Sequence, residues 1–266
     1  WYEQIKQRLQ QAMNQAFPNH SDGFFVKTSS RSAKDACVFR QDFLDLYKTE
    51  LSKTADPSQE NCRIIALLNA AFLSLRVSCA DDVLSMFVVS ERIYQDMLLA
   101  TEAQSSSDEL FKENFIIRPF LPIDIDMEFR GFVYEQRLTC LSQYNYLIYS
   151  PRLCQQKQLV LEKITEFFNQ TVKPKLNRFK SKSYVIDFAL TGKETVDSMK
   201  VWVIELNPFM ETTDGALFSW QSERNLLEGQ QTNENNQPIF RLTEKARPGS
   251  WSMLPNSVRQ WVQNEK

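Results

Sequence analysis

The sequence predicts an α+β fold, in which helices and strands follow one another without the regular alternation of βαβ units. Two kinds of segment carry this prediction. Long segments repeat apolar residues at the spacing of one helical face, and shorter segments concentrate β-branched and aromatic residues, as strands do. Hydrophobic residues make up 42% of the 266 residues, which is enough for a substantial core. This length suits one large domain or two smaller lobes.

The first hundred residues are predominantly helical in pattern. Apolar residues at a spacing of three to four predict helices over 2–16 and 60–77. FFVKTSS at 24–30 predicts a strand that leads into a polar loop. QSSSDE at 104–109 is a polar stretch and marks the expected boundary between two lobes.

The smaller lobe is expected to cover 1–114 and the larger lobe 115–266. FIIRPF at 115–120 predicts a short strand at the start of the larger lobe. Two strands over 128–144 are expected to form a hairpin, although Glu-Gln is a poor pair for its turn. The clearest helical pattern of the chain lies at 152–172.

Charge and cysteine usage narrow the class of protein. The net charge is −2, so the field of the whole chain does not favour nucleic acid. The five cysteines are scattered and form no CxxC pair, which argues against a zinc site and favours reduced thiols in a cytoplasmic protein.

Catalysis through histidine and insertion into a membrane are both disfavoured. His20 is the one histidine of the chain and lies in the polar stretch NHSDG, so chemistry that needs a catalytic histidine is nearly excluded. The most apolar segment, 64–75, is interrupted by Asn69 and is too short to span a bilayer. The chain begins at Trp1 rather than Met, so we expect further sequence to precede it in the full protein.

Acidic and amide side chains gather at the ends of two expected strands, 183–190 and 201–208. Alternation along the second strand places Trp202, Ile204 and Leu206 on a core face and Glu205 with Asn207 on the other. Asp187 occupies a comparable place in the first strand. Oxygen ligands of this kind suit Mg²⁺, which takes one or two carboxylates together with waters and substrate phosphates. Solvated carboxylates at strand ends would show the same pattern, so both interpretations stay open here.

Basic residues at two other strands are candidates for anion binding. Lys27 follows an apolar pair at a strand end, where a lysine can lie against phosphates as a point charge. Glu128 and Arg130 are two residues apart and share one strand face. A surface lysine and a structural ion pair are the alternative interpretations of these positions.

Several of these segments together resemble a known family. EFRGFVYEQRLTCLSQYNY, VIDF and VWVIELNPFMETTDGALFSW are similar to the D123 family, and KTSSRSAKDA at 27–36 resembles its lysine-containing motif. Weaker similarity continues through 238–255, so the resemblance covers nearly the whole chain from about Phe24. It implies an ATP-grasp-like fold of two lobes, with ATP and Mg²⁺ in the cleft between them. It also implies a role in assembling translation initiation factor 2 through its gamma subunit.

The resemblance assigns roles to particular residues. Asp187, Glu205 and Asn207 match the positions that hold Mg²⁺ and the ATP phosphates, although relatives usually carry Asp where Glu205 stands. The remaining nucleotide-binding candidates fall into three groups. Lys27 and Lys34 are candidates for phosphate, and Arg118 and Phe120 are candidates for the adenine pocket. Glu128 and Arg130 are candidates for phosphate or the second substrate. The stretch SSRS after Lys27 departs from the family pattern, which places phosphate contacts inside 28–32 in doubt.

Two classes of function remain open on the sequence. The first is a binding module or chaperone, in which ATP·Mg²⁺ supports the capture of a protein client. The second is an ATP-grasp ligase, which would activate an acceptor as an acyl phosphate or by nucleotidyl transfer, with RNA among the acceptors considered. The basic run KPKLNRFKSK at 173–182 could touch phosphates, although such runs are more often solvated faces and nucleic acid is the less favoured partner.

Overall fold

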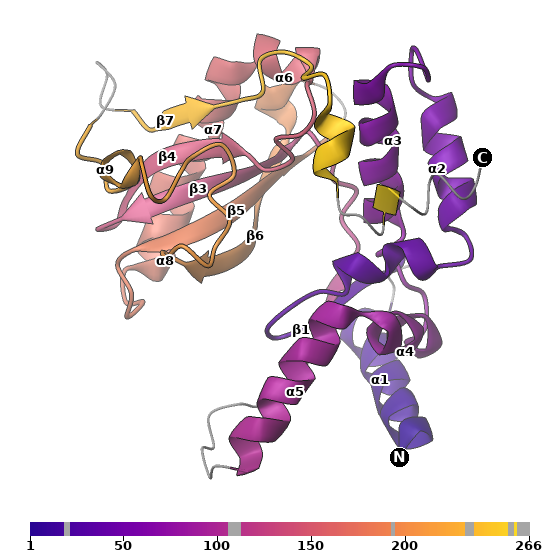
Figure 1. Ribbon diagram of the computed structural model, residues 1–266. Helices are drawn as coiled ribbons and strands as arrows, with labels where there is room; N and C mark the ends of the chain where they lie inside the picture. The colour runs from indigo at the N-terminus through magenta and orange to yellow at the C-terminus, as the bar shows by residue number, and fades with distance from the viewer. Residues whose placement is uncertain (19–21, 106–112, 193–194, 232–236, 255–257, 260–266) are drawn as a thin grey trace. The chain divides into compact units, whose positions relative to one another are not determined.

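The computed structural model describes the chain except residues 19–21, 106–112, 193–194, 232–236, 255–257 and 260–266 (Figure 1). The chain divides into two compact units, Trp1–Leu121 with Leu254–Lys266, and Pro122–Met253. The expected boundary at 114/115 differs from this division, because the strand at 115–119 pairs with a strand of the first unit. Among the helices that the structure describes, none has the length and apolar content needed to cross a bilayer.

Helices and one two-stranded sheet form the first unit. Strands β1 (Phe24–Thr28) and β2 (Phe115–Pro119) pair antiparallel. The helical elements are α1 (Tyr2–Ala16), the 3₁₀ helix η1 (Lys34–Phe39), α2 (Phe43–Ser52), α3 (Glu60–Leu73), α4 (Ala80–Val89) and α5 (Glu91–Ser105).

The core of the first unit follows from amphipathic patterns in its helices and in β1. Leu9 and Met13 of α1 are buried together with Phe24 and Val26, which alternate inward from β1. Asp82 closes a capping box on α4, since its carboxylate accepts from the backbone N–H of Cys79.

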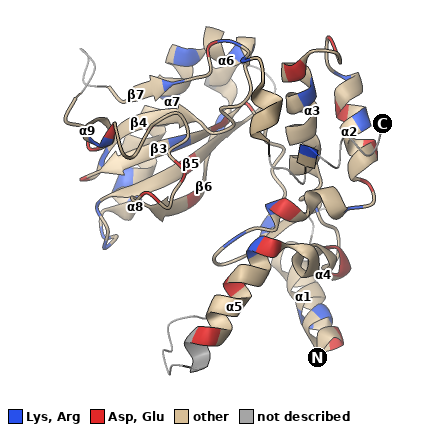
Figure 2. Cartoon of the chain, viewed as in Figure 1, with Lys and Arg blue, Asp and Glu red and all other residues tan. Residues whose placement is uncertain are grey.

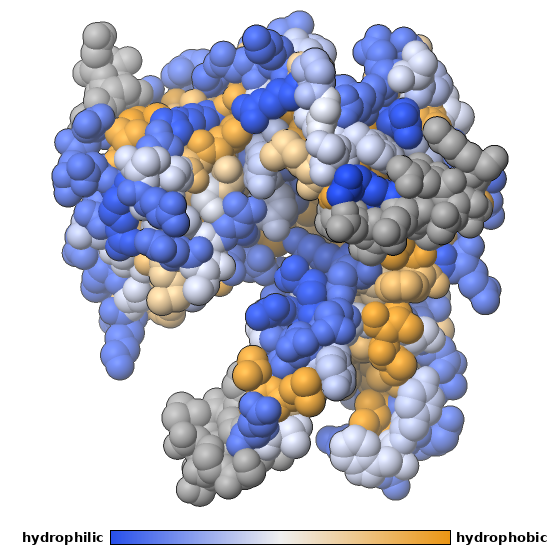
Figure 3. Space-filling view, in the orientation of Figure 1, coloured by the Kyte–Doolittle hydropathy of each residue, from blue (hydrophilic) through white to orange (hydrophobic). Residues whose placement is uncertain are grey.

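Helix α5 is an element that the apolar pattern does not predict. Met97, Leu98 and Leu99 are consecutive and are 37%, 40% and 55% exposed, so they do not form a stripe directed at the core. The apolar strip on this helix is visible in the space-filling view (Figure 3). Helix α2 is likewise absent from the sequence prediction.

A five-stranded sheet with the order β6-β5-β3-β4-β7 organises the second unit. β3, β4, β5 and β6 pair antiparallel, and β7 runs parallel to β4. The strands are β3 (Glu128–Tyr134), β4 (Arg137–Gln143), β5 (Tyr184–Thr191), β6 (Lys200–Pro208) and β7 (Ile239–Arg241).

Helices cover one face of this sheet. The segment predicted as one helix over 152–172 is divided into α6 (Pro151–Gln155), α7 (Lys157–Phe167), a π-helical turn η2 (Phe168–Val172) and α8 (Lys173–Leu176). Side chains of α7 and η2 pack on alternate residues of β3 and β5, with Phe129, Ile164 and Phe188 fully buried. Shorter helical turns occur at η3 (Val196–Ser198), α9 (Arg224–Leu227) and η4 (Ser250–Met253).

The turn of the β3–β4 hairpin uses two residues with positive φ, Glu135 at 46° and Gln136 at 61°. A two-residue hairpin turn of the primed type needs this conformation, which glycine and asparagine adopt most easily. Neighbouring backbone supports the turn, because Gln136 N–H donates to the carbonyl of Lys182 at 2.9 Å and Glu135 N–H donates to Ser183 Oγ at 3.2 Å.

A β-bulge between β5 and β6 corrects the predicted faces of β6. Asp187 lies opposite Glu205, whereas Ala189 lies opposite Trp202, so Ile204 is the extra residue of the bulge. Trp202 therefore shares the face of Glu205, and the predicted core face is wrong for Trp202 and Ile204, whereas Leu206 lies opposite the buried Ile186 on the predicted face. Leu206 is 37% exposed because β6 is an edge strand of the sheet.

We predict that Phe188→Ala destabilises the second unit by about 3–5 kcal/mol, because it leaves a cavity between the sheet and α7. Urea titration would measure the free energy of unfolding. Phe179→Ala is the control in the same unit, since Phe179 is 42% exposed and should lose little. Equal losses for the two variants would contradict this description of the core.

Candidate functional site

Strand register brings five predicted residues to one face of the second unit's sheet. Arg130 lies opposite Asp187, Asp187 lies opposite Glu205, and Asn207 follows two residues after Glu205. Glu128 lies opposite Ala189 on the same face. We call these residues, Glu128, Arg130, Asp187, Glu205 and Asn207, the polar face. The helices pack on the opposite face, so the two sides of one sheet have different roles.

A buried ion pair lies at the centre of the polar face. Arg130 Nε donates to Asp187 Oδ1 at 2.9 Å, and Arg130 Nη2 donates to Asp187 Oδ2 at 2.8 Å. The side chains are 7% and 1% exposed, respectively. Burial alone would lower the pKa of the Arg130 guanidinium, but the hydrogen bonds and charge of Asp187 outweigh it and raise that pKa above its ordinary value.

Two further groups contact the guanidinium, and Ser142 on the neighbouring strand holds the segment beside it. Arg130 Nη1 donates to the backbone carbonyl of Asp214 at 2.8 Å, and the Tyr144 ring lies 4.9 Å from the guanidinium carbon. Ser142 lies opposite Arg130 in β4, and its Oγ accepts from the backbone N–H of Leu217. Sequence reasoning did not assign Tyr144 or Ser142, although both follow Arg130 within the block 128–146. The contribution of Asp214 is its backbone, which no residue pattern reveals.

The donor atoms of the polar face are compatible with a hard cation. Asn207 Nδ2 donates to Asp187 Oδ2 at 3.3 Å. The amide oxygen of Asn207 therefore points away from this carboxylate oxygen and is the atom of the side chain that could bind a cation. Glu205 is half-buried beside them. Two carboxylates and an amide oxygen are ligands that Mg²⁺ accepts. Asp187 is already paired with Arg130. Glu205 is the second carboxylate among these candidate ligands.

The segment after β6 is anchored on the same side of the sheet as the polar face. Phe132 of β3 contacts the rings of Phe218 and Trp220, each with centroids 5.6 Å away. Arg241 of β7 forms a two-pronged ion pair with Glu223 at 2.8 and 2.6 Å. These contacts hold the segment that carries the Asp214 carbonyl over Arg130.

The first unit presents two of the predicted cations on one face of its small sheet. Lys27 and Phe25 alternate outward from β1, and Arg118 lies opposite Phe25. The Arg118 guanidinium is 5.2 Å from the centroid of the Phe25 ring. The register thus brings Lys27 and Arg118 to the same side, with Phe25 between them.

Lys34 and Phe120 do not join this face. Lys34 is the first residue of η1 and is exposed. Phe120 is 7% exposed, its ring contacts Phe72 at 5.0 Å between centroids, and its N–H donates to the carbonyl of Gly23 at 3.0 Å. The Phe120 side chain and N–H are therefore used by the fold of the first unit.

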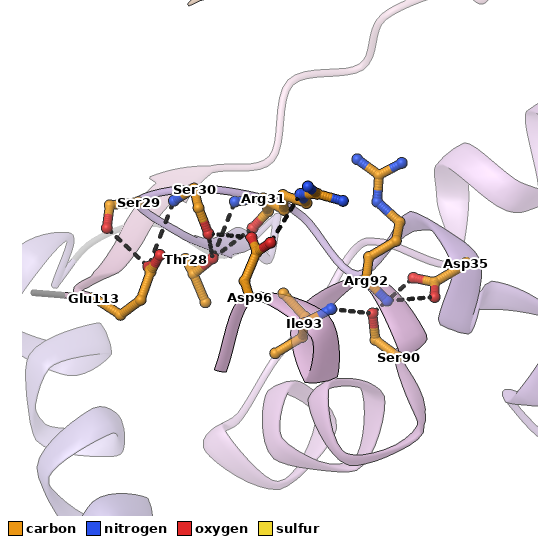
Figure 4. A network of polar contacts seen from close by, with 10 residues as sticks. All are labelled: Thr28, Ser29, Ser30, Arg31, Asp35, Ser90, Arg92, Ile93, Asp96 and Glu113. Carbon is orange, nitrogen blue, oxygen red and sulfur yellow. Dashed lines mark hydrogen bonds and ion pairs between the residues drawn. The ribbon is translucent and has the colours of Figure 1, made fainter. Parts of the chain in front are cut away.

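Acidic residues hold the turn that follows Lys27 (Figure 4). Ser30 Oγ donates to Asp96 at 2.5 Å, and Arg31 Nε pairs with the other oxygen of this buried carboxylate at 3.1 Å. Ser29 Oγ donates to Glu113 at 2.8 Å, and Ser30 N–H reaches the same oxygen at 3.4 Å. Burial raises the pKa of Glu113, but these hydrogen bonds lower it, and the net pKa lies below its ordinary value. The hydroxyls of Ser29 and Ser30 thus donate to the carboxylates of Glu113 and Asp96.

We predict that Arg130→Met destabilises the protein by about 3–5 kcal/mol, because it leaves the Asp187 charge buried without its partner. Asp187→Asn should cost a similar amount, and the double variant should cost less than the sum of the two. Chemical denaturation of all four proteins completes a double-mutant cycle. Additive losses would show that the pair is not coupled as the geometry indicates.

Comparison with protein families agrees with the resemblance stated above. The model of the D123 family matches residues 68–261 of this chain. A protein of Xenopus laevis named "Translation initiation factor eIF2 assembly protein" is 29% identical over 178 residues, which cover 65% of this chain and 50% of that protein. A protein of Acanthamoeba polyphaga mimivirus, "Putative CDC123-like protein L884", is 27% identical over 176 residues, which cover 65% of this chain and 49% of that protein.

Solved structures give a matching fold. Cdc123 from Schizosaccharomyces pombe superposes with a TM-score of 0.59 at 22% identity, over 89% of this chain and 78% of that one. Its C-terminally truncated form gives a TM-score of 0.61 over 90% and 79%. The chain spans about half the length of the curated relatives that it matches. Since the family model covers most of the sequence and the fold agrees, this chain belongs to the D123 family.

Proposed function

We propose that this chain binds ATP with Mg²⁺ and acts in the assembly of translation initiation factor 2, with the gamma subunit as its protein client. The observation that carries the nucleotide part is the polar face, where a buried arginine lies beside two carboxylates and an amide. The role in eIF2 assembly is inferred from the names of relatives in Xenopus laevis, Xenopus tropicalis and Schizosaccharomyces pombe, each an eIF2 assembly protein, and the gamma subunit is what the family resemblance implies.

The energetics of the polar face favour a functional role over a purely structural one. Desolvation of two charges offsets much of their attraction, so a buried ion pair contributes little net stability compared with well-packed apolar residues. One nitrogen of Arg130 donates to a backbone carbonyl, and the other two donate to Asp187. Asp187 occupies the fork of Nε and Nη2, so a phosphate oxygen would accept from the remaining N–H of Nη1 or Nη2, which these bonds keep oriented.

The chain's own residues would divide the work on the nucleotide. Glu205, Asn207 and Asp187 would hold Mg²⁺, which supplies charge neutralisation at the phosphates when bound. Arg130 would orient a phosphate from the centre of the sheet. Lys27 would bind phosphate as a point charge, as the ATP-grasp likeness implies.

The two candidates for the adenine pocket, Arg118 and Phe120, have different roles in this proposal. Arg118 shares the outward face of Lys27, which favours it for contact with the nucleotide. Phe120 would act by supporting β2 from within the core. Contacts from the Ser29 and Ser30 hydroxyls are not part of the proposal, since Glu113 and Asp96 accept from them.

We predict that Glu205→Gln weakens ATP binding in the presence of Mg²⁺ by about tenfold or more, since it removes a charge-assisted ligand. Isothermal titration with ATP and MgCl₂ would measure the dissociation constant. A substitution of Glu205 is a better test than one of Asp187, because it leaves the ion pair of Arg130 with Asp187 intact. Lys27→Met should weaken binding similarly, with Lys48→Met on α2 as the matched control. Unchanged affinity in both test variants would remove the nucleotide site from these residues.

We predict that the immobilised chain retains purified gamma subunit of translation initiation factor 2, and retains more when ATP and Mg²⁺ are present. Labelled ATP in the same assay would report on turnover. Retention without ADP or AMP supports an assembly factor. Failure to retain the subunit under both conditions contradicts the client assignment, and AMP or ADP release coupled to modification of an acceptor would replace it with a ligase.

A further inference from the structure

The segment 173–182 concentrates positive charge on the second unit. It contains five basic residues and no Asp or Glu, within a chain whose net charge is −2. Figure 2 shows Lys and Arg gathered around α8 and the loop that follows it. We call this stretch the basic segment; its cations are Lys173, Lys175, Arg178, Lys180 and Lys182.

The cations of the basic segment are available to a partner. The side chains of Lys173, Lys175, Arg178 and Lys180 are exposed, whereas Lys182 is half-buried and donates to the carbonyl of Asn177 at 2.7 Å. Within the part of the chain that the structure describes, no carboxylate forms an ion pair with any of the five. Other surface cations of this unit, such as Arg152 and Arg224, do have carboxylate partners.

Backbone contacts give the segment a defined shape. Phe179 N–H donates to the carbonyl of Leu176 at 2.9 Å, which closes the turn after α8. The carbonyl of Lys182 accepts from Gln136 N–H, and Ser183 Oγ accepts from Glu135 N–H, so the segment is tied to the β3–β4 hairpin. The charges are therefore displayed from a fixed scaffold, which reduces the entropy lost on binding.

An exposed aromatic ring lies among these charges. Phe179 is 42% exposed between Arg178 and Lys180, and its edge-on contact with the Tyr184 ring has a centroid distance of 6.1 Å at 82°. Tyr184 supports the ring without covering it. An exposed phenyl ring among cations is the arrangement on which a nucleic-acid base stacks while the backbone phosphates meet the charges.

We propose that the basic segment binds single-stranded nucleic acid, with Lys173, Lys175, Arg178 and Lys180 on the phosphates and Phe179 stacked on a base. This surface lies outside the polar face and does not depend on the nucleotide site. An acidic protein segment would use the cations but has no need of the ring. Anionic lipid would use both, but one phenyl ring offers little apolar area to a bilayer.

Fluorescence anisotropy of the full chain with a labelled oligouridine of about 15 nucleotides would test the proposal. Four phosphate contacts predict that log K falls against log salt with a slope of about −3. The variant Lys175→Ser, Arg178→Ser, Lys180→Ser should weaken binding at least tenfold and reduce the slope by about 2. Phe179→Leu should weaken binding about tenfold with the slope unchanged, because the ring is lost and the charges stay. An oligothymidine arm distinguishes RNA from DNA.

The matched control removes the same charge elsewhere through Arg8→Ser, Lys48→Ser and Arg92→Ser, all exposed residues of the first unit. This control should bind as the parent chain does. Equal weakening in both triple variants, or affinity unaffected by Phe179→Leu, would overturn the proposal. Binding of polyglutamate or phosphatidylserine vesicles in preference to the oligonucleotides would also overturn it.

Discussion

The ion pair between Arg130 and Asp187 joins the two central strands of the larger sheet across their polar face. Both charges are removed from water, so neither side chain can move or be replaced without leaving the other uncompensated. The third donor of Arg130 binds the Asp214 carbonyl, which links the strands to the segment after β6. Asn207 donates to the same carboxylate and brings in the edge strand. One buried contact thereby links side chains or backbone of β3, β5, β6 and the loop beside them.

The sheet separates stability from chemistry by using its two faces differently. Alternate residues of β3 and β5, including Phe129 and Phe188, pack on α7 and exclude water. The residues between them carry the charges of the polar face. At one end of that face, Phe132 and Trp220 supply apolar support, so the charged centre is bordered by packed rings. A low-dielectric border strengthens the electrostatic interactions beside it, including the ion pair of Arg130 with Asp187.

In the first unit, the strands and the turn that follows Lys27 present their polar groups in different ways. Lys27 and Arg118 are half-buried on the outward face of β1 and β2. The hydroxyls after Lys27, in contrast, donate to Asp96 and Glu113, two carboxylates from distant parts of the chain. These two carboxylates therefore stabilise the turn. The positive charges nearby are Lys27 of β1 and Arg118 of β2. The basic segment adds a separate positive surface on the second unit, without an acid to balance it.

The sequence by itself predicted the α+β class and most of the strands, because alternation and β-branched runs are local properties. The family came from the resemblance of whole motifs, which the family model confirms. It also predicted that Glu205 and Asn207 share a face, with Asp187 at a comparable place in the preceding strand. The tertiary structure decided the rest: the bulge at Ile204 turned Trp202 onto the polar face, and strand register paired Arg130 with Asp187. Burial of Phe120 and capture of the Ser29 and Ser30 hydroxyls likewise depend on residues far away in the chain. Register, bulges and long-range hydrogen bonds are set by the packing of whole elements, so no local pattern in the sequence specifies them.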